Sequence, residues 1–67
     1  MKISVRNKIP ATIKEVKLGA VMAEIVMQAG NNEIVAVITI DAAEDLALKA
    51  GDSVTALVKS TSVMIQK

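Results

Sequence analysis

Two short polar segments near the ends of the chain, residues 4–7 and 59–62, stand out in a sequence that has few other reactive groups. The composition includes no His, Cys, Phe, Tyr or Trp, so hydroxyls, backbone amides and fixed positive charges must supply any specific chemistry. These groups bind anions by donating hydrogen bonds to them. They do not readily form or break covalent bonds, because no strong base or nucleophile stands among them.

Residues 59–62 read Lys-Ser-Thr-Ser, which places three hydroxyls directly after a lysine at the end of an apolar stretch. In such a turn, backbone N–H groups and hydroxyls can donate to one anion while the ammonium group attracts it. An ordinary turn is the simpler interpretation, since Ser and Thr often bond to their own backbone. Arg6 is the only arginine, and with Asn7 it could likewise belong to a solvated N-terminal arm. The residues alone leave both interpretations open.

A catalytic role has little support in the sequence. The seven carboxylates fall mostly at predicted turns or at alternating exposed positions, and no His or Cys is present to act with a serine as base or nucleophile. A dyad of Lys59 with a nearby serine is the remaining catalytic arrangement. We therefore expect a binding protein and not an enzyme.

The size of the chain predicts assembly. Residues 1–67 are expected to form a single domain, and a chain this short buries only about 60% of the surface that its unfolded form exposes. Disulfides and the common zinc sites are excluded by the absence of Cys and His, which leaves association with other chains as the usual stabilising device. A hydrophobic content of 52% supports a homo-oligomer, because so small a domain cannot hide that much apolar surface alone.

Charge and hydropathy limit the other partners. The formal net charge is only +1, with eight basic and seven acidic residues mixed along the chain, and there is no aromatic residue on which a nucleotide base could stack. We expect no nucleic-acid partner. No apolar run approaches the roughly 20 residues that span a bilayer, and the first residues do not resemble a signal peptide, so we expect a cytoplasmic protein without a membrane partner.

Alternating apolar residues predict three long strands in the first half of the chain. The alternation in residues 9–18 changes parity near Lys14 and Glu15, which indicates a β-bulge, and Gly19 ends this strand. Residues 21–28 form the second strand, and residues 29–32 form a hairpin turn that contains Gly and Asn. Residues 33–40 are apolar on both faces, so the third strand is expected to be covered on both sides.

The second half predicts one short helix and two further strands. Asp41 is the expected N-cap with Glu44 three residues later, the helix continues to Leu48, and Gly51 follows its end. Residues 54–59 form the fourth strand and residues 63–65 a short fifth strand. The predicted fold class is all-β with one short helix, in the order β-β-β-α-β-β. This is the order of a small five-stranded barrel like the oligonucleotide/oligosaccharide-binding (OB) fold.

Four segments have a recognisable pattern: the opening residues 1–7, the stretch 39–46, the Leu-Lys-Ala-Gly-Asp turn at 48–52 and the closing residues 56–65. They resemble the molbindins, single-domain proteins of the Mop family with a TOBE-type domain. The resemblance covers essentially the whole chain, although Val5 stands where the family pattern Ser-Ala-Arg-Asn has Ala, and Ala42 stands where Ser is common.

The resemblance implies an OB-like barrel assembled as a hexamer, a trimer of dimers, which binds molybdate or tungstate at subunit interfaces for intracellular storage or homeostasis. The metal would be held as its oxyanion, without direct coordination and without an organic cofactor. A second interface site is implied around residues 19–22, and Thr39 and Asp41 could approach the anion from a neighbouring subunit. The residues carried over are, for the main site, Ser4, Val5, Arg6, Lys59, Ser60 and Thr61, and for the second site, Gly19, Ala20, Val21 and Met22.

Two other functions remain as alternatives. One is a small β-dimer that binds duplex DNA, like transition-state regulators, in which strand-rich chains also carry a Leu-x-x-Gly-Asp turn. Such a protein needs a basic face, which seven scattered lysines and one arginine against seven acids do not provide. The other is a purely structural interaction domain that binds no oxyanion.

Overall fold

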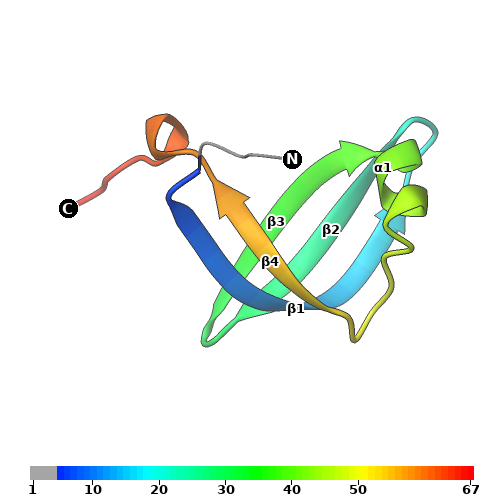
Figure 1. Cartoon of the computed structure of the whole chain (residues 1–67), viewed down its shortest axis with the longest axis horizontal. Coiled ribbons are helices and arrows are strands. Elements are labelled where there is room, and N and C mark those ends of the chain that lie inside the picture. Colours follow the sequence, from blue (N-terminus) through cyan, green and yellow to red (C-terminus); the bar gives the residue numbers. More distant parts are fainter. Residues whose placement is uncertain (1–4) are drawn as a thin grey trace.

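A computed structural model describes residues 5–67 and shows one strongly curved antiparallel sheet with a short helix at one end (Figure 1). The four strands lie in the order β3-β2-β1-β4. The predicted class, mostly β with one short helix, is confirmed. The elements are β1 (Asn7–Leu18), β2 (Met22–Ala29), β3 (Asn32–Thr39), α1 (Ile40–Asp45), β4 (Ser53–Val58) and a 3₁₀ turn (Ser60–Ser62).

β1 is the long inner strand of the curved sheet, and it pairs with both β2 and β4. Its first half pairs with β4 and its second half with β2, and Thr12 is the residue at which the pairing passes from one neighbour to the other. Ile13 lies opposite Met27 while Glu15 lies opposite Val26, so the residue between them is extra on β1. A β-bulge of this kind bends a strand and increases its twist. The bulge predicted near Lys14 and Glu15 is confirmed.

β2 and β3 form a hairpin in perfect register from Met22 opposite Thr39 to Ala29 opposite Asn32. The turn between them consists of Gly30 and Asn31, and Gly30 has a φ of 61°, a left-handed conformation that glycine adopts without steric cost. The predicted turn is confirmed, and the strands that flank it are displaced by one residue from the predicted ranges.

The core lies inside the curved sheet. It is built from small and branched side chains of β1, β2 and β4 together with Ala43 of the helix; its buried members are Ala11, Ile13, Ala23, Ile25, Met27, Ala43 and Ala56. The outer face of β3 is open, since Val35 is 49% and Val37 is 63% exposed. The expectation that this strand is covered on both sides is therefore wrong for the single chain, because no second layer of residues 5–67 packs over that face.

The helix begins and ends differently from the prediction. Thr39 is the N-cap: its backbone is still extended, and its hydroxyl accepts a 3.1 Å hydrogen bond from the N–H of Ala42. Asp41, the predicted cap, lies inside the first turn. The helix ends at Asp45, and Ala47 follows with a φ of 51°, so Gly51 belongs to the turn before β4 and does not terminate the helix.

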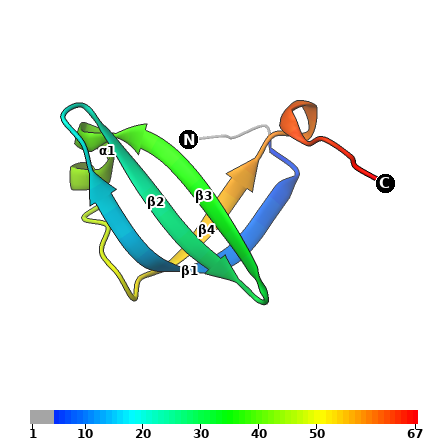
Figure 2. The same cartoon turned by 180° about the vertical axis from the view of Figure 1, so that it is seen from behind.

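The predicted fifth strand is wrong for residues 5–67. The chain forms the 3₁₀ turn after β4 and then leaves the barrel, as Figures 1 and 2 both show, so residues 63–65 pair with no strand. Met64 and Ile65 are 92% and 94% exposed. The sheet therefore has two open edges, β3 and β4. Among residues 5–67, no helix is both long and apolar enough to cross a membrane.

Candidate functional site

A polar hollow of about 330 Å³ lies where β1 begins and β4 has just ended, and it is lined by Arg6, Lys59, Ser60 and Thr61. These are four of the six residues predicted for the main anion site. They come from two segments that are more than fifty residues apart in the chain, and the fold alone brings them together.

Strand pairing explains this meeting. β1 and β4 are antiparallel, with Asn7, the first residue of β1, opposite Val58, the last residue of β4. Arg6 and Lys59 are therefore the next residues beyond the last pair of the ladder. The side-chain amide of Asn7 also donates a 3.1 Å hydrogen bond to the backbone carbonyl of Val58, which joins the two strand ends a second time.

The hydroxyl residues lie on the 3₁₀ turn. Lys59 has an extended backbone and precedes this turn, and the N–H of Ser62 donates to the Lys59 carbonyl at 2.9 Å. The first N–H groups of a helical turn have no acceptor inside that turn. As far as residues 5–67 show, the backbone amides of Ser60 and Thr61 can therefore donate, beside the two hydroxyls, to a ligand in the hollow.

The hollow combines two cations with no acid in its lining. The ion pairs among residues 5–67 involve other lysines: Lys14 lies 3.0 Å from Glu33, and Lys17 lies 3.6 Å from Glu24 and 4.0 Å from Glu15. Arg6 and Lys59 therefore bring two positive charges to one hollow, and a bound anion would neutralise them.

The remaining predicted residues lie elsewhere. Val5 is half-buried next to Arg6 but does not line the hollow, and Ser4 lies outside the described residues. Thr39 uses its hydroxyl to cap the helix, and the exposed Asp41 lies in the first turn of that helix.

The predicted second site lies at the opposite end of β1, in the turn to β2. Gly19, Ala20, Val21 and Met22 are all exposed, and the N–H of Gly19 donates to the Met22 carbonyl at 2.8 Å. The turn is tight, because a Cβ on Gly19 would lie 2.9 Å from that carbonyl oxygen. The segment contributes no cation, so any anion here would depend on backbone amides or on another chain.

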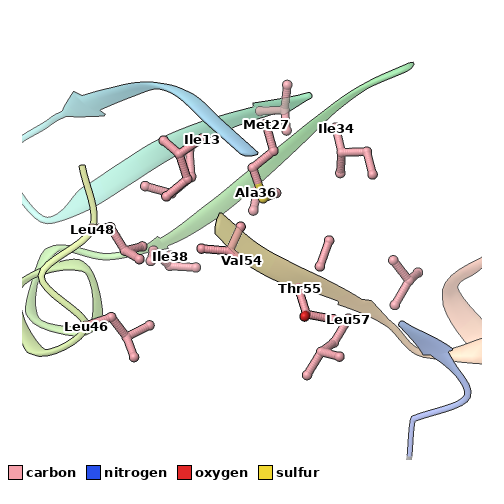
Figure 3. Close-up of a pocket in the computed structure, with 14 residues that line it drawn as sticks. Ile13, Met27, Ile34, Ala36, Ile38, Leu46, Leu48, Val54, Thr55 and Leu57 are labelled. Atoms are coloured by element: carbon pink, nitrogen blue, oxygen red, sulfur yellow. The ribbon is translucent and has the colours of Figure 1, made fainter. Parts of the chain in front are cut away.

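An apolar groove between the open edges β3 and β4 was not predicted from the sequence. It encloses about 370 Å³. In Figure 3, Ile34, Ala36 and Ile38 of β3 lie opposite Val54, Thr55 and Leu57 of β4, and Leu46 and Leu48 lie near the helix end. The alternation of residues 34, 36 and 38 indicated an inward face, and these three side chains are half-buried and pack against the core while they also line the groove. Residues 5–67 include no group of three or more acidic side chains that could hold a metal ion.

Comparison with known proteins gives matches along nearly the whole chain. The TOBE domain family matches residues 3–65. Molybdenum-pterin-binding protein 2 of Clostridium pasteurianum is 46% identical over 66 residues, which cover 97% of each protein. Among solved structures, a molybdate binding protein from Sporomusa ovata is 57% identical with a TM-score of 0.95, and the match covers 100% of both chains. MopII from C. pasteurianum is 42% identical with a TM-score of 0.91, and the match covers 98% of this chain and 100% of MopII.

Proposed function

Because this chain belongs to the TOBE domain family, we propose that it binds molybdate or tungstate, as the intact oxyanion, in the hollow lined by Arg6, Lys59, Ser60 and Thr61. The chain is a binding protein and not an enzyme, in agreement with relatives that are named for binding molybdenum compounds. One observation carries the proposal to this particular site: two cations and two hydroxyl residues converge there without a carboxylate.

The chemistry of the hollow suits a tetrahedral dianion. Hydrogen bonds from cationic donors to an anion are shorter and about twice as strong as neutral ones. All the side-chain groups that line the hollow can donate: a guanidinium, an ammonium and two hydroxyls. Phosphate carries a proton near neutral pH that needs an acceptor; neither cation can accept it, and a hydroxyl of Ser60 or Thr61 that accepted it would be a weaker partner than a carboxylate, which the lining lacks. Sulfate is a smaller dianion, so the size of the completed cavity would favour molybdate or tungstate over it.

We also propose that the ligand is the oxyanion alone, although the relatives in C. pasteurianum are named for a molybdenum-pterin. A pterin is a flat heteroaromatic ring, and proteins commonly hold such rings by stacking them on aromatic side chains. This sequence has no aromatic residue. The polar lining of the hollow offers donors for oxygen atoms but no platform for a ring.

Assembly is the second part of the proposal. We propose that residues 1–67 act as one domain within a homo-oligomer, a hexamer arranged as a trimer of dimers, with the oxyanion at a subunit interface. Support comes from the two open sheet edges, the apolar groove between them and the exposed side chains of Met64 and Ile65. Unpaired strand edges and large apolar patches favour association with another chain.

The interface completes the site in this proposal. Arg6 and residues 59–61 are exposed and can surround only one side of an anion, so donors from a second subunit would enclose the other side. Ser4 and Val5 are proposed as further contacts at the same site, and residues 19–22 as a separate interface site. The proposed role is storage or homeostasis of molybdenum or tungsten in the cytoplasm.

Isothermal titration of the purified protein with molybdate, tungstate, sulfate and phosphate tests the proposal. We expect saturable binding of the first two anions and much weaker binding of the other two. Lys49→Ala is the matched control for substitutions of Lys59, because Lys49 is also exposed but lies in the turn before β4, away from the hollow. Equal binding of all four anions would remove the proposed selectivity, and no binding of any would remove the function.

A further inference from the structure

Asn7 follows Arg6 directly and is the residue at which the sheet begins. It is half-buried at the first position of β1, opposite Val58 at the last position of β4. Its side-chain amide donates a 3.1 Å hydrogen bond to the Val58 carbonyl. We infer that Asn7 is a positioning residue, which holds Arg6 and Lys59 together before the anion arrives. This inference rests on the proposed function of the hollow.

The location of Asn7 separates positioning from direct contact. The anion hollow is lined by Arg6 and residues 59–61, and Asn7 is not among its lining residues. Asn7 lines a neighbouring hollow instead, with Lys8, Ile9 and Val58, and Arg6 borders both. The Asn7 side-chain amide therefore bonds to the backbone of Val58, the residue before Lys59. It can affect the ligand only by fixing the positions of Arg6 and Lys59.

The hydrogen bond from Asn7 to Val58 matters because Arg6 and Lys59 flank it. Arg6 and Lys59 flank the last pair of the ladder, Asn7 and Val58, and both line the anion hollow, so two like charges share this end of the sheet. The end of a ladder frays easily, because few contacts hold it. A side-chain bond across the last pair opposes both fraying and repulsion. Holding the donors in place beforehand raises affinity, since less ordering remains to be done on binding.

Titration of Asn7→Ala with molybdate tests the inference. Loss of one neutral hydrogen bond should weaken binding about two- to tenfold. The matched control is Gln28→Ala, which removes a similar bond, from a side-chain amide to the Gly30 carbonyl at 2.8 Å, in the hairpin turn at the far end of β2. This control should bind molybdate like the unmodified protein.

A double-mutant cycle distinguishes positioning from general stabilisation. In an Arg6→Ala background the repulsion is gone, so the additional affinity loss from Asn7→Ala should fall below about twofold. An equal loss in both backgrounds would overturn the inference, because Asn7 would then act independently of Arg6. Unchanged affinity in Asn7→Ala alone would overturn it as well.

Amide hydrogen exchange, measured without ligand, tests the structural role of Asn7 separately from the proposed function. Protection at residues 56–58, the end of β4, should fall about two- to tenfold in Asn7→Ala and stay unchanged in Gln28→Ala. Unchanged protection in Asn7→Ala overturns the inference whatever the titration shows. If the unmodified protein binds no molybdate but protection falls as expected, the proposed function fails while the structural role of Asn7 stands.

Discussion

Arg6 and Lys59 lie one residue beyond the pair formed by Asn7 and Val58, so the last rung of the β1–β4 ladder sets their separation. Cross-strand pairs contribute roughly 0.2 to 1 kcal/mol, and like charges in such positions are unfavourable. A dianion bound in the hollow would neutralise both charges, so its binding would stabilise the folded chain by mass action.

Substitution of Lys59 tests the site directly. A charge-assisted hydrogen bond contributes about 1.5 to 3 kcal/mol, so Lys59→Ala should weaken molybdate binding about ten- to over a hundredfold. Circular dichroism should show an unchanged β-rich fold, because Lys59 is exposed. Lys49→Ala serves as the control and should bind normally. Unchanged affinity in Lys59→Ala would reduce residues 59–62 to an ordinary turn.

The exposed C-terminal residues should contribute to assembly. Ile65→Asp places a charge on a side chain that is 94% exposed in the single chain, and its burial in an oligomer would then be costly. We expect a smaller assembly by light scattering after size-exclusion chromatography. Gln66→Asp adds the same charge to the next residue and should leave the mass unchanged. Identical masses for both variants and the unmodified protein would place the interface elsewhere.

The helix cap predicts different effects for substitutions of Thr39 and Asp41. Thr39→Val keeps the branched shape but removes the hydroxyl that accepts from Ala42, so the free energy of unfolding should fall by about 1 kcal/mol. Asp41→Asn removes only an acid in the first turn and should cost about 0.3 kcal/mol. Urea titration measures both. The reverse order would restore Asp41 as the cap.

Ala47 offers a stabilising substitution. Its φ of 51° is a conformation that costs a residue with a Cβ about 1 kcal/mol or more, and the position directly follows the helix C-cap, where glycine is preferred. Ala47→Gly should therefore raise the free energy of unfolding by about 1 kcal/mol. Ala50→Gly, in the same connection but without a positive φ, should lower it by about 0.4 to 1 kcal/mol. A destabilised Ala47→Gly variant would contradict this account.

Sequence periodicity predicted the elements that depend on neighbouring residues. The parity change at Lys14 located the bulge, and Gly30 with Asn31 located the hairpin, because both features follow from local backbone geometry. The charge and hydroxyl pattern left an ordinary turn as an alternative, and the resemblance to the molbindins singled out Arg6 and residues 59–61, four residues that the fold brings to one hollow. Their meeting depends on the antiparallel pairing of β1 with β4, which local patterns do not specify.

The misplaced features have a different origin. Asp41 and Thr39 are both good caps by residue type, and the extended backbone of Thr39 at the end of β3 decided between them. Ala47 occupies a position that favours glycine, so no residue marked the true helix end. Residues 63–65 have the composition of a strand, but a strand also requires a free edge in the right place, and the 3₁₀ turn directs the chain away from its own sheet.

β1 runs through its bulge from the anion hollow to the turn at Gly19, a path of about 36 Å along the strand, and the bend makes the straight line between its ends shorter than this. The screening length in physiological salt is about 8 Å. Two dianions held at opposite ends of this strand would therefore not sense each other's charge. If residues 19–22 form the proposed second site, charge alone would not make the filling of one site depend on the other.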